Sequence, residues 1–73
     1  MEERELKERM LRENDEFRRI FEEHRDFELA LEAISRKPSP SEEDLVAERD
    51  LKKKKLALKD RMYLMMAEYR RAL

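Results

Sequence analysis

The chain has 73 residues, neither cysteine nor glycine, and 18 basic against 19 acidic side chains. The missing cysteine excludes disulfides and thiolate chemistry, and the missing glycine excludes the glycine-rich loops that hold nucleotide phosphates. So short a chain forms a single domain, residues 1–73, with a small core, and its helices must therefore match closely or associate with other helices.

The N-terminus and the hydropathy pattern indicate the compartment. Residues 1–5 are charged instead of forming the apolar core of a signal peptide. The longest apolar run covers residues 62–67 and is far shorter than the roughly 20 residues that a membrane span requires. We therefore expect a cytoplasmic protein without membrane contact.

Residues 3–35 predict the first helix, because their apolar residues recur in alternating steps of four and three, as in a coiled-coil seam. The seam consists of Leu6, Met10, Phe17, Ile20, His24, Phe27, Leu31 and Ile34. Glu13 fills the missing place, and we expect it to face inward and to set the register by pairing with Lys59 or Arg61. His24 is the only histidine and has no second ligand at usable spacing, which favours a structural role over metal binding.

Two prolines separate the first helix from a second one. Pro38 and Pro40 each remove a backbone donor and disfavour helix at the preceding residue, so we expect a turn over residues 36–39. Ser39 is then the expected N-cap, with Pro40 at the first helical position and a glutamate three residues after the cap. The second helix is predicted over residues 40–72.

The two helices have matching apolar faces and nearly equal lengths. One narrow stripe of the second helix carries Leu51, Leu58, Met62, Met65 and Tyr69. Paired residue numbers are expected to sum to about 75 across the short turn, which places Phe17 against Leu58 and His24 against Leu51. The sequence therefore predicts an all-α fold, a coiled-coil-like antiparallel hairpin of two helices, each about 50 Å long.

A second apolar face lies on the opposite side of the second helix. It is formed by Leu45, Val46, Leu56, Tyr63 and Leu64. One partner helix cannot cover both faces, so we expect self-association, most simply a dimer of two hairpins packed as a four-helix bundle. Two alternatives stay open: a different protein docks on this face, or isolated apolar residues are tolerated there.

The strongest charge concentration is a basic run on the second helix. It consists of Arg49, Lys52, Lys53, Lys54, Lys55 and Lys59, which are candidate contacts for an anion or a nucleic acid. Four consecutive lysines fan around a helix, however, and no aromatic residue interleaves them to stack on bases. Nucleic acid is therefore the alternative partner and a protein the preferred one.

No residue set forms a recognisable catalytic, metal or cofactor site. Carboxylates are spread over the whole chain, and a two-helix hairpin offers little concavity in which to shift their pKa values. We expect a non-catalytic structural or adaptor module that needs no cofactor. The alternative function is salt-dependent binding of nucleic acid through the basic run.

Two stretches resemble a known family. Residues 51–63, LKKKKLALKDRMY, resemble the second helix of the YdcH-like family of small bacterial proteins of unknown function, and residues 17–24, FRRIFEEH, resemble its first helix. The resemblance implies a helical hairpin and a bacterial cytosol, with no assigned activity. Asp60 matches the family pattern but faces away from the seam, where it is a candidate for a cap or for a pair across an oligomer contact.

Overall fold

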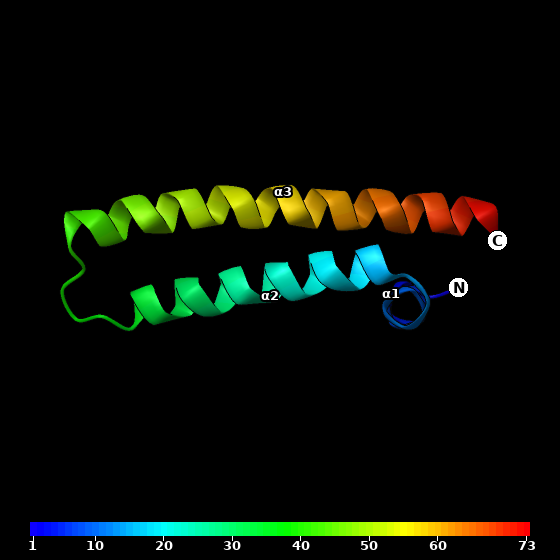
Figure 1. Ribbon diagram of the computed structural model, residues 1–73, viewed down its shortest axis with the longest axis horizontal. Coiled ribbons are helices and arrows are strands. Elements are labelled where there is room, and N and C mark those ends of the chain that lie inside the picture. The colour runs from blue at the N-terminus through cyan, green and yellow to red at the C-terminus, as the bar shows by residue number, and fades with distance from the viewer.

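The computed structural model describes residues 1–73, which form three helices and no strand. Helix α1 covers Glu3–Glu13, α2 covers Asp15–Ser35 and α3 covers Glu42–Ala72. Helices α2 and α3 run antiparallel, whereas α1 turns out of their plane and is seen end-on in Figure 1. The molecule measures 49 × 20 × 16 Å. None of its helices has the length and apolar character that would cross a membrane.

The predicted first helix is broken at Asn14, so the prediction of one continuous helix over residues 3–35 is wrong. Asn14 has extended backbone angles, φ −121° and ψ 109°, and its side chain accepts a hydrogen bond of 2.9 Å from the Phe17 N–H. Asparagine is among the best N-caps, and Asp15 and Glu16 then favour the positive end of the new helix. The local preference for a cap therefore interrupts the heptad pattern.

Arg18 holds the two helices at this corner. Its Nε donates to the Leu11 carbonyl at 2.9 Å, and its Nη2 donates to the Arg12 carbonyl at 3.1 Å. Both carbonyls lie in the last turn of α1, where helix carbonyls have no intrahelical partner. The same guanidinium reaches Asp15 at 3.1 Å. One side chain thus caps α1 while belonging to α2.

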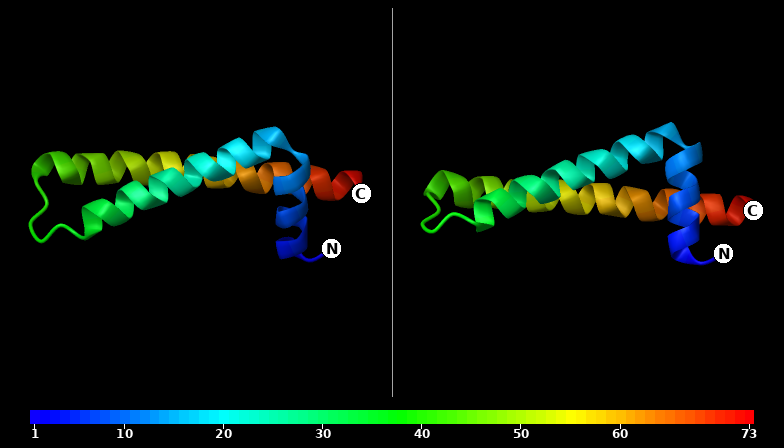
Figure 2. Two further views of the ribbon diagram at one scale, coloured as in Figure 1. Left: turned by 60° about the horizontal axis from the view of Figure 1, so that its bottom comes forward. Right: turned by 90° about the horizontal axis from the view of Figure 1, so that it is seen from below.

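The break lets α1 cross the pair of long helices and close a core at one end of the molecule. Figure 2 shows α1 running steeply across α2 and α3, near the C-terminal part of α3. The six buried residues all belong to this three-helix cluster: Leu6, Met10, Phe17, Met62, Met65 and Met66. Toward the turn, α2 and α3 have only each other and leave their apolar residues at most half-buried. The core is therefore confined to the α1 end.

Glu13 lies on the surface, so its predicted inward position and its pairing with Lys59 or Arg61 are wrong. It accepts a hydrogen bond of 2.8 Å from the Tyr69 hydroxyl and lies 3.4 Å from Arg9. The Tyr69 bond lowers the pKa of Glu13 and raises that of Tyr69. Arg61 instead donates to Glu16 at 3.0 Å. The break at Asn14 rotates Glu13 away from the seam and makes it a contact between α1 and α3.

Helix α3 begins two residues later than predicted. Ser41, and not Ser39, is the N-cap, and the loop spans residues 36–41. The Ser41 hydroxyl accepts from the Asp44 N–H at 3.1 Å, and the Asp44 carboxylate accepts from the Ser41 N–H at 2.9 Å, which completes a capping box. Lys37 also reaches Asp44 across the loop at 2.7 Å. Asp44 thus bonds both the capping residue Ser41 and the loop residue Lys37, which favours the start of α3 directly after Ser41.

The longer loop and the crossing of the helices also change the register. His24 was expected beside Leu51 but shares a cavity with Lys59 and Met62, about two turns farther along α3. The antiparallel pairing of α2 with α3 agrees with the prediction. The residue-by-residue pairing does not agree, and the two-residue delay in the start of α3 explains only part of this shift.

Replacing Leu6 tests whether α1 belongs to the core. Leu6 is fully buried, so Leu6→Ala should lower the free energy of unfolding by about 2–5 kcal/mol, through lost burial and the cavity left behind. Leu29→Ala is the matched control, because Leu29 is 54% exposed, and it should change stability by less than about 0.5 kcal/mol. Urea unfolding followed by circular dichroism measures both. Equal effects would show that α1 does not pack as described.

The Asp44 capping box predicts an acid-dependent contribution to stability. Hydrogen bonds from Lys37 and from the Ser41 backbone lower the pKa of Asp44 from 3.8 to about 2. A carboxyl whose pKa is lower in the folded than in the unfolded state stabilises the fold at pH values above its ordinary pKa. This contribution disappears as the pH falls through about 2. Asp44→Asn should therefore lower the urea midpoint at pH 7, and the difference should shrink toward pH 2. Asp26→Asn, an exposed change on α2, should show no such trend.

Candidate functional site

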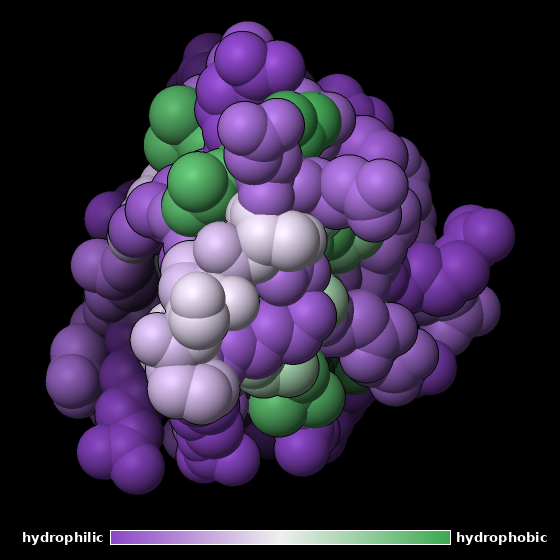
Figure 3. Space-filling model, turned by 90° about the vertical axis from the view of Figure 1, so that its left-hand side faces the viewer, coloured by the Kyte–Doolittle hydropathy of each residue, from purple (hydrophilic) through white to green (hydrophobic).

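Five exposed apolar side chains lie on one side of α3, and we call this set the α3 stripe. They are 48–58% exposed, and they are Leu45, Val46, Leu56, Tyr63 and Leu64. These residues belong to the second apolar face that the sequence analysis proposed as an interface. At the turn end of the molecule, green apolar atoms also interrupt the purple polar surface on more than one side of the pale loop (Figure 3). Many apolar side chains of α3 thus lie outside the small core and remain exposed to solvent.

The α3 stripe consists of two adjacent rows. With about 100° of rotation per residue, Leu45, Leu56 and Tyr63 lie within about 20° of one another around the α3 axis. Val46 and Leu64 share a second row about 100° farther around the helix. Both rows lie away from the buried methionines that face α1 and α2. The stripe is therefore open to a partner while the hairpin stays closed.

The structure does not gather the basic run on one face. Lys52 pairs with Glu48 at 3.0 Å, and Arg49 lies 3.7 Å from Asp50. Lys53 and Lys54 are exposed and point around the helix without an ion pair, whereas Lys55 is half-buried. These residues provide scattered charge and no continuous basic groove.

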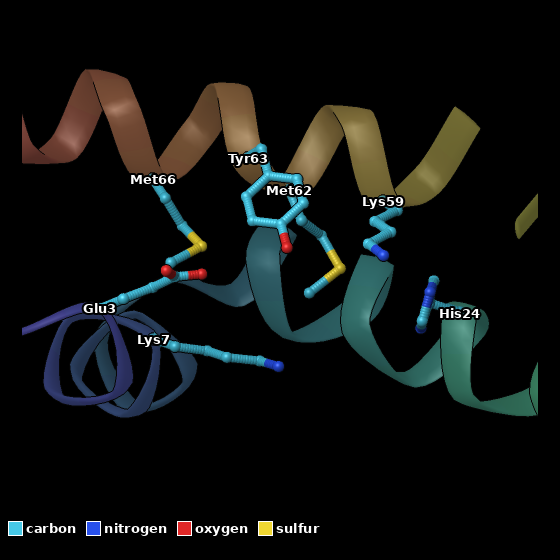
Figure 4. Close-up of a pocket in the computed structure, with 7 residues that line it drawn as sticks. All are labelled: Glu3, Lys7, His24, Lys59, Met62, Tyr63 and Met66. Atoms are coloured by element: carbon cyan, nitrogen blue, oxygen red, sulfur yellow. The ribbon is translucent and has the colours of Figure 1, made fainter. Parts of the chain in front are cut away.

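Lys59 is separated from the rest of the run, because it lines a cavity where all three helices meet (Figure 4). The cavity has a volume of about 90 Å³. Its lining residues are Glu3, Lys7, His24, Lys59, Met62, Tyr63 and Met66. Helix α1 contributes the first two, α2 contributes His24 and α3 contributes the others. The cavity thus depends on the crossing of α1.

His24 is placed between a carboxylate and this cavity. Its Nδ1 lies 3.3 Å from Glu28 Oε1, and its side chain is 16% exposed. Its Nε2 is buried and has no hydrogen-bond partner within the protein. The chain brings together no group of three or more histidine and acidic side chains that could hold a metal ion. His24 therefore has one nitrogen tied to α2 and one still available.

Sequence reasoning missed the contributions of Glu3 and Lys7. A straight first helix would place Lys7 about 25 Å from His24 along the axis, so the two residues could not line one cavity. The available signal was the Asn-Asp-Glu run at residues 14–16, which is typical of a helix start. A helix break predicted at this cap would have allowed residues 3–13 to fold back against the hairpin.

The match to a family model covers residues 17–66, which is more than half of the chain. The model describes a protein of unknown function, DUF465. The chain belongs to the DUF465 family. The matched range begins at the buried Phe17 and covers α2, the loop and α3 up to Met66, whereas α1 of this DUF465 protein lies outside it. Comparisons with curated proteins and with solved structures each find no match.

Proposed function

We propose that this DUF465 protein is a non-catalytic structural or adaptor module that acts as a homodimer, in which the α3 stripes of two copies face each other. The observation that carries the proposal is the exposure of five apolar side chains on one side of α3, in a chain that buries only six residues. Exposed apolar side chains that gather on one side of a helix are typical of interaction surfaces. Covering the stripe would supply the burial that a chain of 73 residues lacks.

The stripe is self-complementary when two copies of α3 pair in antiparallel fashion. Leu45 and Leu64 lie symmetrically about the midpoint between Lys54 and Lys55, and so do Val46 and Tyr63. A two-fold axis through that midpoint places each apolar residue opposite an apolar residue of the second copy. One register thus matches four of the five stripe residues.

The charges between the stripe residues support the same register. Arg49 and Asp60 are also symmetric about the midpoint, so each Arg49 would face Asp60 of the second copy. Asp60 is exposed and has no ion pair within its own chain, and the contact of Arg49 with Asp50 is a long one at 3.7 Å. If the two α3 helices paired in parallel and in register, Arg49 of one chain would instead face Arg49 of the other. Charge therefore favours the antiparallel dimer and gives Asp60 a role.

The length of α3 suits a dimer contact of standard size. A standard interface buries about 800 Å² on each partner, which is about one seventh of the 5748 Å² surface of this chain. Helix α3 has 31 residues and offers a contact about 46 Å long. The dimer would contain four long helices, with the two α3 helices inside and an α2 helix on each outer side. This arrangement is the form that the predicted four-helix bundle would take.

Other partners fit the geometry less well. Nucleic acid is the second candidate, but its phosphates would meet lysines that fan around α3 and partly pair with acidic neighbours. A separate protein could use the charged outer faces of the dimer, as an adaptor requires. We also propose, from the sequence, that the protein is cytoplasmic and belongs to the YdcH-like group of bacterial proteins.

Introducing charge into the stripe tests the interface itself. Leu56→Glu combined with Tyr63→Glu should convert the dimer to a monomer, because the carboxylate at position 63 would be desolvated against Val46 of the second copy and the apolar contact of Leu56 would be lost. Sedimentation equilibrium measures the mass, and circular dichroism checks that the helices persist. Lys54→Glu, on the opposite side of α3, is the control and should leave the mass unchanged. A doubly substituted chain with the parent mass would contradict the proposed interface.

Exchanging charges tests the register separately. Arg49→Glu and Asp60→Arg should each weaken dimerisation roughly tenfold, because each replaces two attractive contacts with two repulsive ones. The double substitution should restore the parent dissociation constant to within about threefold, since it exchanges the partners. The two tests can also disagree. If the Leu56 and Tyr63 variant is monomeric but the charge exchange does not restore dimerisation, the α3 stripe is the interface and the antiparallel register is wrong.

A further inference from the structure

Three basic side chains from three different helices converge on the cavity described above. Lys7 extends into it from α1, His24 borders it on α2, and Lys59 points toward His24 from α3 (Figure 4). The only acidic group in the lining is Glu3, which lies on the Met66 side of the cavity in the same view. The His24 end of the cavity is therefore rich in positive charge.

Neither lysine has a carboxylate partner within ion-pair distance, although the chain contains 19 acidic residues. Lys7 is held in place by its position over the Phe21 ring, 5.1 Å from the ring centre. Such a contact orients the ammonium group without neutralising it. Lys7 and Lys59 thus place two positive charges at one cavity, and no acidic side chain of the protein neutralises them.

The unpartnered nitrogen of His24 adds a third polar group to the cavity. Buried polar atoms are nearly always hydrogen-bonded, so the isolated Nε2 calls for a partner in the cavity. Nδ1 is already directed to Glu28, 3.3 Å away. A ring nitrogen donates when it carries a proton and accepts when it does not, and a phosphate that keeps one proton offers both acceptor oxygens and a hydroxyl donor. Such a group can pair with Nε2 and also tolerates two neighbouring ammonium groups.

We propose that this cavity binds a small phosphate-type oxyanion, either inorganic phosphate or the phosphate group of a monoester. Its volume of about 90 Å³ equals that of about three water molecules, which suits a compact ion. Lys7 and Lys59 would donate to two oxygens, and His24 Nε2 would share a hydrogen bond with a third, as a tetrahedral ion allows. A carboxylate group would bind more weakly, because it carries one charge and has one oxygen pair. The site shares only Tyr63 with the proposed dimer contact.

The test uses His24 as its own reporter, because it is the only histidine in the chain. Inorganic phosphate is titrated into the full-length protein at pH 7 and constant ionic strength, and the ring signals of His24 are followed by NMR. The expected result is a saturable shift that acetate and chloride do not reproduce. Glycerol phosphate in a parallel titration distinguishes a monoester site, which gives the tighter curve, from a site for the free ion.

Lys59→Gln is the decisive variant, because Lys59 is exposed and its removal does not disturb the core. It should weaken phosphate binding at least about tenfold, the effect expected for a hydrogen bond to a charged group. Lys53→Gln removes the same charge from an exposed position outside the cavity and should leave the curve unchanged. A linear shift, an equally strong response to acetate, or equal losses in the two variants would overturn the proposal.

Discussion

The structure depends on the corner at Asn14. A side-chain cap on the Phe17 N–H starts α2, and Arg18 closes the end of α1 by binding two of its last-turn carbonyls. Both sets of groups would be unpaired at a helix break without these contacts. The corner therefore compensates locally for the interruption of a long helix. Its position decides where α1 can pack.

The corner also explains why the molecule is well packed at only one end. Two helices alone bury a single seam, whereas a third helix crossing them closes a pocket around Phe17 and the α3 methionines. Methionine suits this junction, because its unbranched side chain adapts to irregular gaps between crossing helices. Toward the loop no third helix is present, and the apolar side chains of α3 remain on the surface. The asymmetry of the core and the exposure of Leu45 and Val46 near the loop therefore have the same origin.

The family match and the cavity concern different parts of the chain. The DUF465 range contains α2, the loop and most of α3, and so includes the α3 stripe and the Arg49 and Asp60 positions. The cavity also needs Glu3 and Lys7 of α1, which lie outside that range. The proposed pairing through α3 thus uses the part shared with the family model. The proposed anion site also uses a segment in which this chain extends beyond that model.

The sequence by itself determined the helical class, the antiparallel pairing of the two long helices and the five residues of the α3 stripe. These features follow from apolar periodicity and from prolines, both of which act locally or along one helix. It did not determine the path of α1, the start of α3 at Ser41 or the meeting of Lys7 with His24 and Lys59. At those points a cap competes with a continuous heptad pattern, and only the burial gained by crossing helices decides between them. The tertiary structure therefore placed the core and the cavity, because both depend on contacts between residues that no single helix brings together.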